Sequence, residues 1–245
     1  MLNIKTPLMM AGCAAALAFS ALDARASVVM HGTRVVFAAQ EREASLRLQN
    51  VGSTTDLVQA WIDDGRTVSE TPVEESAVPF FMRPPIFRME AGRSQLLRIF
   101  HTGESMPADR ESLYYLNVLA VPGKPADAAD GVHLNVVVRT RMKLFYRPKG
   151  LSGAGAAAAP SKLQWALVKD ANGWVLNTTN PTPYHVSVDS IRAGGKIVAD
   201  IALPLATTSY RLSHAQANAL GSQVTFQYIS DHGGTFDVTS PLARP

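Results

Sequence analysis

Four cations stand close together near the end of an apolar segment, and their side chains are suited to hold an anion. The segment reads LNVVV over residues 134–138, and the cations that follow are Arg139, Arg141, Lys143 and Arg147. An arginine offers a planar fork of donors to a carboxylate or phosphate, and a lysine offers a compact positive charge. These cations therefore either form the solvated edge of a strand or bind an acidic group.

The side chains needed for metal or cofactor chemistry do not occur at useful spacings. The only cysteine is Cys13, and no two histidines form an HxxxH or HExxH pair. The sequence has no Walker loop, and no GxGxxG segment follows a strand-like run. We therefore expect no metal and no cofactor. The six histidines are read as surface or packed residues: His31, His101, His133, His185, His214 and His232.

A hydrolase would need an activated serine in a suitable turn, which this sequence does not supply. The DHGG segment at residues 231–234 resembles part of an esterase oxyanion loop. The nearest candidate for the nucleophile is GLSGA at residues 150–154, but this segment ends in Ala rather than Gly and does not lie between a strand and a helix. We predict that the protein is not an enzyme. The net charge of +3 is also too small to indicate a nucleic-acid partner.

Residues 1–26 have the layout of a secretory signal peptide. A cationic start at Lys5 precedes an apolar run over residues 8–22, and Ala24 and Ala26 fit a cleavage site of the A-x-A type. The apolar run is shorter than the roughly 20 residues that span a bilayer. We therefore expect export and no membrane-spanning segment. A lipoprotein signal at Cys13 is the less favoured alternative.

The rest of the chain predicts an all-β protein. Runs such as LVQAWIDDG and SLYYLNVLAVPG combine β-branched and aromatic residues with turn residues, and no long stretch has the 3.6-residue period of a helix. The pattern breaks at residues 147–162, where glycine and proline favour a flexible connection over a helix. Residues 213–221 form the one plausible helical segment. We predict two β-sandwiches of about 120 and about 95 residues, joined near Pro148.

The apolar segment and its cations predict a strand that could be either central or at the edge of its sheet. Alternation puts Leu134, Val136 and Val138 on one face. A central strand would bury both faces and leave Arg139 and Arg141 out of place. An edge strand could carry the two arginines as protection against aggregation, or could be left open to pair with another chain.

Several motifs, in this order along the chain, resemble the periplasmic chaperones of the chaperone-usher pathway of pilus assembly. The most specific is MPADRESLYYLNVLAVP at residues 106–122. The others are TRVVF at 33–37, QAWIDDG at 59–65, PPIFRMEAG at 84–92, KLFYRP at 143–148, NPTPYHVSV at 180–188 and SDHGG at 230–234. Together they extend over nearly the whole chain after the expected signal peptide.

The resemblance implies two immunoglobulin-like β-sandwich domains that form an L with a cleft between them. We expect a signal peptide over residues 1–26, a first domain over residues 27–148 and a second over residues 149–245. The implied protein is periplasmic, binds and stabilises pilus subunits, and delivers them to an outer-membrane usher. Two copies without a subunit could cap each other. None of these steps makes or breaks a bond, which agrees with the lack of catalytic residues.

The resemblance also implies how charged residues in the cleft are used. The C-terminal carboxylate of a subunit is expected between Arg34 and Lys143. An ion network of Glu111, Arg147 and Asp231 is expected to fix the angle between the domains, so that the cleft is formed before the subunit arrives.

The implied donor strand is the one that the chaperone lends to a subunit lacking a strand of its own. Its row of side chains consists of Leu134, Val136 and Val138. Lys143 is odd-numbered whereas this row is even-numbered, so strict alternation would put Lys143 on the opposite face of the strand. We therefore expect a bulge or bend between Thr140 and Lys143. Arg139 and Arg141 are expected to be charges of the exposed edge.

Two other classes of protein remain as alternatives. The first is an exported immunoglobulin-like adhesin or carbohydrate-binding protein, in which exposed aromatic residues would matter more than Arg34 and Lys143. The second is a hydrolase on a sandwich scaffold, since such a fold can host a site that the sequence does not advertise.

Overall fold

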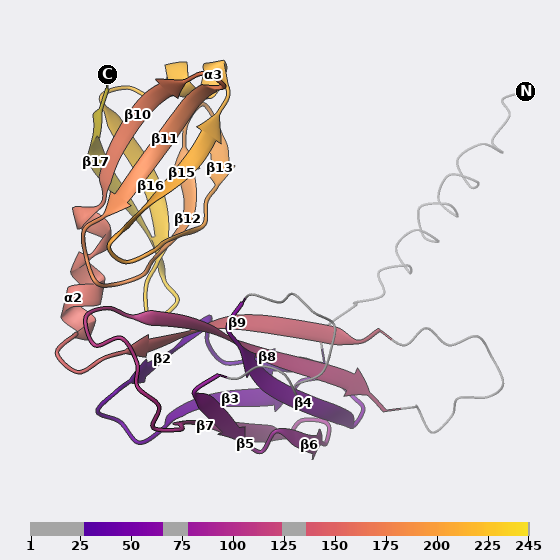
Figure 1. Ribbon diagram of the computed structural model, residues 1–245. Helices are drawn as coiled ribbons and strands as arrows, with labels where there is room; N and C mark the ends of the chain where they lie inside the picture. Colours follow the sequence, from indigo (N-terminus) through magenta and orange to yellow (C-terminus); the bar gives the residue numbers. More distant parts are fainter. Residues whose placement is uncertain (1–26, 66–77, 124–135, 245) are drawn as a thin grey trace, which may run out of the picture.

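The protein consists of two β-rich halves that meet at an angle and give the molecule the shape of an L (Figure 1). The structure is a computed structural model that describes residues 27–65, 78–123 and 136–244. The expected signal peptide, residues 1–26, lies outside the described residues. Leu134 of the expected donor row also lies outside them.

The first half is a sandwich of two sheets. Its strands are β1 (Val28–Met30), β2 (Arg34–Ala38), β3 (Ala44–Asn50), β4 (Asp56–Asp63), β5 (Phe80–Arg83), β6 (Ile86–Met89), β7 (Ser94–His101), β8 (Ser112–Pro122) and β9 (Val138–Arg147). One sheet has the order β1-β3-β7-β5 and the other the order β2-β9-β8-β4-β6. Alternate side chains of both sheets, among them Phe37, Leu48, Leu116 and Leu144, fill a common core.

The second half has its own core and its own strands. These are β10 (Gln164–Asp170), β11 (Gly173–Asn180), β12 (Val186–Arg192), β13 (Lys196–Val198), β14 (Ile201–Ala202), β15 (Ala206–Leu212), β16 (Gln223–Ile229) and β17 (Thr235–Ala243). They follow one hydrogen-bonded path, β13-β12-β16-β17-β10-β11-β15, with β14 on β12. Trp165, Leu176 and Phe226 are buried inside it. The prediction of an all-β protein with two sandwiches is confirmed.

The connection between the halves contains a helix, and the expectation of a flexible connection is wrong there. Helix α2 (Gly153–Ala158) is followed by a 3-10 turn (Pro160–Lys162). The Ser152 side chain caps the helix by accepting a bond from Gly155 N–H, and Ser152 N–H donates to Tyr184 Oη at 2.9 Å. Gly155 lies so close to Tyr184 that a Cβ would not fit. A contact with a distant residue therefore stabilises a helix whose composition disfavours it.

The other expected helix is confirmed. Helix α3 (His214–Ala219) begins at Ser213, which forms a capping box with Gln216. This helix was predictable because its stop and start signals are local.

Strand β9 occupies two kinds of position in its sheet. It pairs with β8 over residues 138–146, from Val138 opposite Ala120 to Tyr146 opposite Ser112. It pairs with β2 only from Lys143 onward. Residues 138–142 therefore have one edge that no described strand covers. The sequence left a central strand and an edge strand as alternatives, and each is correct for half of β9. Its C-terminal half is central and its N-terminal half is an edge.

The expected bulge between Thr140 and Lys143 is absent. The pairing of β8 with β9 runs without a shift in register across this region. Met142 and Leu144 face the core, so Lys143 lies on the opposite, outer face of the sheet. The expectation was wrong because it assumed that the donor row and Lys143 must share a face.

Candidate functional site

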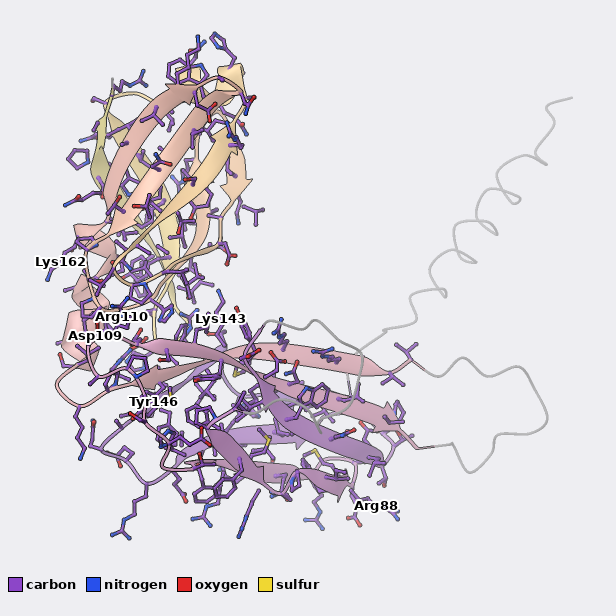
Figure 2. All side chains as sticks on the ribbon, viewed as in Figure 1. Arg88, Asp109, Arg110, Lys143, Tyr146 and Lys162 are labelled. Carbon is purple, nitrogen blue, oxygen red and sulfur yellow. The ribbon has the colours of Figure 1, made fainter. Side chains whose placement is uncertain are left out.

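The cations Arg34 and Lys143 lie side by side where β2 begins to cover β9. They are direct partners in the parallel register of the two strands, so their side chains leave the sheet on the same face. Figure 2 shows Lys143 on the side of this sheet that faces the second domain. No described residue gives Lys143 a hydrogen bond or an ion pair within 4.0 Å. Burial lowers the pKa of Lys143, the charge of Asp200 opposes this shift, and the charge of Arg34 adds to it.

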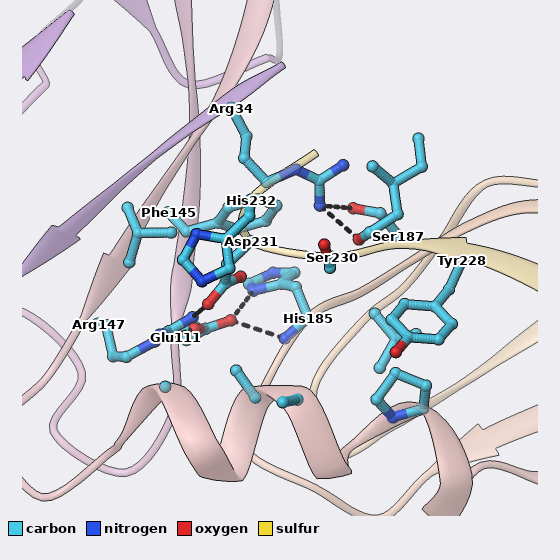
Figure 3. Close-up of a pocket in the computed structure, with 17 residues that line it drawn as sticks. Arg34, Glu111, Phe145, Arg147, His185, Ser187, Tyr228, Ser230, Asp231 and His232 are labelled. Atoms are coloured by element: carbon cyan, nitrogen blue, oxygen red, sulfur yellow. Dashed lines mark hydrogen bonds and ion pairs between the residues drawn. The ribbon is translucent and has the colours of Figure 1, made fainter. Parts of the chain in front are cut away.

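Arg34 already bridges the two domains. Its Nη1 donates to Ser187 Oγ at 3.1 Å and to the Ile229 carbonyl oxygen at 2.8 Å (Figure 3). Its Nε is buried without a partner among the described residues. Burial lowers the pKa of Arg34, and the charge of Asp231 opposes this shift. One side of the guanidinium thus binds the second domain, and its Nε still lacks an acceptor.

Glu111, Arg147 and Asp231 come together at the domain joint. Arg147 donates from Nε to Glu111 Oε1 at 2.7 Å and from Nη2 to Asp231 Oδ2 at 2.8 Å. The Glu111 side chain is 2% exposed and that of Arg147 is 7% exposed. Glu111 belongs to the first half of the chain and Asp231 to the second, so this network links the two domains (Figure 3).

A fourth residue of the joint, His185, was not predicted. Its backbone N–H donates to Glu111 Oε2 at 2.8 Å, and its Nδ1 lies 3.4 Å from the same oxygen. Its ring packs on Phe145 with 5.4 Å between the ring centres. His185 and Ser187 are both part of the NPTPYHVSV motif, so the sequence contained a signal for this segment but none for its role.

Acid should weaken this joint. Burial raises the pKa of Glu111, but the bonds from His185 and the charge of Arg147 outweigh burial and leave the pKa below its ordinary value of 4.5. A carboxylate with a lowered pKa stabilises the fold fully above the unfolded pKa, and this stabilisation is lost as pH falls through the folded pKa. We expect the unfolding free energy to fall with acidification below about pH 4.5. Denaturant titrations at several pH values should show a smaller fall of the unfolding free energy with acid in Glu111→Gln than in the wild type. An equal dependence on pH in the two proteins would contradict the assignment of this effect to Glu111.

A cavity of about 370 Å³ lies at the domain boundary, beside Arg34 and the joint. Both domains line it, with Arg34, Phe145 and Arg147 on one side and Ser187 and His232 on the other. Figure 3 shows the charged groups at its wall directed toward one another across the domain boundary. An acidic group that entered this cavity beside Arg34 would be sheltered from water, which strengthens its interaction with the guanidinium of Arg34.

Arg139 and Arg141 lie on the open edge with their backbone, but their side chains lie on the outer face of the sheet. Arg139 donates to Asn117 Oδ1 at 2.8 Å, and Arg141 donates to Asp63 Oδ1 at 2.6 Å. Both arginines are therefore held by side chains of β8 and β4, rather than being free charges of an edge.

Of the expected donor row, Val136 and Val138 are described. Val136 is 59% exposed, and Val138 is the first residue of β9. Val138 shares the face of Met142 and Leu144, so the row continues the core-facing side of β9 beyond the covered part of the strand.

Both halves of the chain match families of known proteins. Residues 27–152 match the family described as pili and flagellar-assembly chaperone, PapD N-terminal domain, and residues 158–240 match the pili assembly chaperone PapD, C-terminal domain. The chain belongs to this family of pilus-assembly chaperones. The resemblance seen in the sequence is thereby confirmed, as are the immunoglobulin-like fold of both domains and the prediction that the chaperone is not an enzyme.

Individual members of the chaperone family are similar over most of their length. The chain is 39% identical to the chaperone protein FimB/FhaD of Bordetella pertussis, over 94% of each chain. It is 36% identical to the Pseudomonas aeruginosa CupB2 chaperone, whose crystal structure superposes with a TM-score of 0.70 over 88% of this chain and all of that one. The Salmonella enterica SafB chaperone, solved with the SafA pilin, is 29% identical with a TM-score of 0.73 over 88% and 96%.

The described part of the chaperone offers no obvious metal site. Within it, no group of three or more His, Cys, Asp and Glu side chains could hold a metal ion. Across the same residues, no helix is long and apolar enough to cross a membrane.

Proposed function

We propose that this chaperone captures pilus subunits through their C-terminal carboxylate and completes their fold with strand β9. The carboxylate would lie between Arg34 and Lys143, and a strand of the subunit would pair with β9 from Lys143 toward Val138. Backbone pairing supplies affinity in such a complex, and alternating side chains supply specificity. SafB, a relative of the same fold, is recorded in complex with a pilin.

One observation carries this proposal: the uncovered half of β9 begins where the two cations stand. Lys143 is the last residue toward the N-terminus that β2 covers, and Arg34 is its partner. A chain whose carboxylate is bound by these cations could continue along the open edge of β9 without a break. Its end would be fixed by charge, which sets the register of all pairs that follow.

The apolar row supports the same proposal. Leu134, Val136 and Val138 would enter the groove of a subunit that lacks one strand, where they would replace missing core side chains. The exposure of Val136 fits this role, because an apolar side chain left in water gains about 1.5–3 kcal/mol when a partner buries it fully.

Glu111, Arg147 and Asp231 would not touch the subunit. In this proposal they fix the angle between a first domain over residues 27–148 and a second over residues 149–245. A fixed angle keeps Ser187 and the Ile229 carbonyl of the second domain against Arg34, so that its guanidinium is already placed beside Lys143 when the carboxylate arrives, which lowers the ordering cost of binding.

The rest of the pathway follows from the chaperone role. We place the protein in the periplasm after removal of residues 1–26, and we expect it to hand subunits to an outer-membrane usher. In the absence of subunits, two copies could pair through the open edge of β9 and cap each other.

A synthetic peptide tests the carboxylate anchor directly. The probe is a labelled peptide of alternating apolar and polar residues with a free C-terminal carboxylate, and the control is the same peptide with an amidated C-terminus. We expect the free acid to bind at least about tenfold more tightly, since a charge-assisted bond contributes about 1.5–3 kcal/mol. Equal affinity for acid and amide would overturn the anchor.

Alkaline pH should weaken capture through Lys143. Burial holds the pKa of Lys143 below its ordinary value of 10.5, and a bound carboxylate would raise it again. Affinity for the free acid should therefore be constant near neutral pH and fall as pH rises through the lowered pKa. The Lys143→Arg variant stays charged in this range and should lose the decline. Fluorescence anisotropy across pH measures both, and a decline that persists in Lys143→Arg would exclude Lys143 as its cause.

A further inference from the structure

The free backbone groups on the open edge of β9 belong to Arg139 and Arg141. Ala39 N–H donates to the Arg147 carbonyl oxygen at 2.8 Å, so the backbone groups of Arg147 point toward β2. In a strand, the N–H and C=O groups of every second residue point to the same side. Those of Arg139 and Arg141 therefore point away from β8, into the part of the edge that β2 does not cover. A partner strand would bond to these groups.

The Arg139 side chain is fixed across the neighbouring strand. Its Nε and Nη2 donate to Asn117 Oδ1 at 3.1 and 2.8 Å. Its guanidinium lies 5.1 Å from the centre of the Trp61 ring on β4. An aromatic face attracts a guanidinium at this distance, so the side chain is held by both a hydrogen bond and a ring.

The Arg141 side chain is fixed in the same way. Its Nη2 donates to Asp63 Oδ1 at 2.6 Å, and its guanidinium lies 3.8 Å from the centre of the Tyr115 ring. Arg139 also lies 4.0 Å from Asp63 through its Nη2. One carboxylate on β4 thus attracts both arginines of the open edge.

The two acceptors are buried and joined to each other. Asn117 is fully buried, Asp63 is 3% exposed, and Asn117 Nδ2 donates to Asp63 Oδ2 at 2.7 Å. Asp63 Oδ1 also accepts a bond from Gly65 N–H at 2.8 Å. The result is a chain of polar contacts across β9, β8 and β4 on the outer face of the sheet.

We propose that Asp63 and Asn117 are positioning residues that hold the open half of β9 in the geometry of a paired strand before a subunit arrives. This inference rests on the proposed function, because it assumes that the edge pairs with a subunit. A half-strand bonded on one side only tends to fray, and fraying would have to be reversed on binding. Neither residue needs to touch the subunit, since both act through the arginines.

The opposing interpretation is that these contacts only add to overall stability. Partly exposed ion pairs often contribute little to it. The two interpretations differ in what they affect: a positioning role changes local opening of β9 and the rate of capture, whereas a stabilising role changes the unfolding of the whole domain.

The Asp63→Asn variant separates these interpretations by hydrogen exchange of the full chain without a partner. It keeps the size and the acceptor for Gly65 N–H but removes the charge that attracts both arginines. We expect the amides of Val138, Thr140 and Met142, which bond to β8, to exchange about tenfold faster. The amides of β7, in the other sheet, should keep their wild-type rates. Arg141→Gln, changed at a partly exposed side chain, should act in the same direction.

The matched control is Asp170→Asn in the second domain. Asp170 Oδ1 accepts a bond from Asn172 N–H at 2.8 Å and from Arg211 Nη1 at 2.8 Å, so it combines a turn contact with an arginine pair as Asp63 does. This variant should leave exchange in β9 unchanged. Faster exchange throughout the first domain in Asp63→Asn, including β7, would overturn the positioning role.

Association of the free-acid peptide gives the second readout. We expect Asp63→Asn to bind it about three- to tenfold more slowly than the wild type, and Asp170→Asn to bind at the wild-type rate. Wild-type exchange and association in both Asp63→Asn and Arg141→Gln would overturn the inference. If instead the wild type binds acid and amide peptides equally, the proposed anchor fails, and the exchange rates alone still decide whether Asp63 holds the strand.

Discussion

Replacement of Lys143 by alanine should abolish subunit capture while leaving the stability of the chaperone itself almost unchanged. Lys143 makes no hydrogen bond or ion pair within the described residues, and burial disfavours its charge, as its lowered pKa indicates. Its removal therefore costs the free protein little. In the complex, loss of one partner from a buried charge pair costs about 2–5 kcal/mol, which is enough to prevent stable capture.

Arg34→Ala should abolish capture as well, but with a second effect. Arg34 donates to Ser187 Oγ and to the Ile229 carbonyl oxygen, so its removal also breaks bonds between the domains. We expect a measurable loss of unfolding free energy, of about 1–3 kcal/mol, in this variant alone. The two variants thus share the loss of binding and differ in stability.

Co-expression with candidate pilin subunits measures the capture. The readouts are the amount of subunit in the periplasm and its co-purification with the chaperone, and thermal unfolding of the free chaperone reports stability. Lys162→Ala is the control, because Lys162 is an exposed lysine of the connection and lies away from the sheet that carries Lys143 (Figure 2). Capture at wild-type levels in both Arg34→Ala and Lys143→Ala would refute the anchor.

Replacement of Glu111 by alanine should cause the largest loss of stability among the polar residues of the joint. The change leaves Arg147 buried with Asp231 as its remaining partner and removes the acceptor of His185 N–H. Breaking a buried pair in this way costs about 3–5 kcal/mol, because the buried Arg147 then keeps only Asp231, whose side chain is 28% exposed. Denaturant unfolding measures this loss, and small-angle scattering reports whether the domains still keep one angle.

The matched control for Glu111 is Glu43. It also forms an ion pair with an arginine, Arg98, but both side chains are partly exposed, at 31% and 54%. Glu43→Ala should therefore leave the unfolding free energy almost unchanged, because solvent screens this pair. Similar losses in the two variants, or an unchanged scattering curve in Glu111→Ala, would show that the joint does not fix the domains.

The elements that the sequence predicted correctly are those whose signals are local. Alternation of apolar and polar residues indicated the strands, and Ser213 with Gln216 marked the start of α3. Helix α2 was missed because part of its support comes from Tyr184, which lies 32 residues beyond Ser152. No local pattern reports such a contact.

The same limit applies to the candidate site. Motifs led to Arg34, Lys143 and the charged residues of the joint, since each stands in a recognisable segment. Ser187 and His185 stand in such a segment too, but nothing in it indicated that Arg34 and Glu111 would bind them. The bulge was expected because alternation puts Lys143 and the donor row on opposite faces of the strand. This expectation was wrong, since the register between β8 and β9 is unbroken.

The cations of residues 139–148, RTRMKLFYRP, show most clearly what the sequence decided and what the tertiary structure decided. The sequence by itself determined a strand with charges on one face, because the period of a strand is a local property of the chain. Only the tertiary structure decided which charges are held and which stays free: Arg141 finds Asp63 at a separation of 78 residues, Arg139 finds Asn117 at 22, and Lys143 finds no partner among the described residues. Such pairs depend on which strands become neighbours, and burial of apolar surface across the whole sandwich decides that.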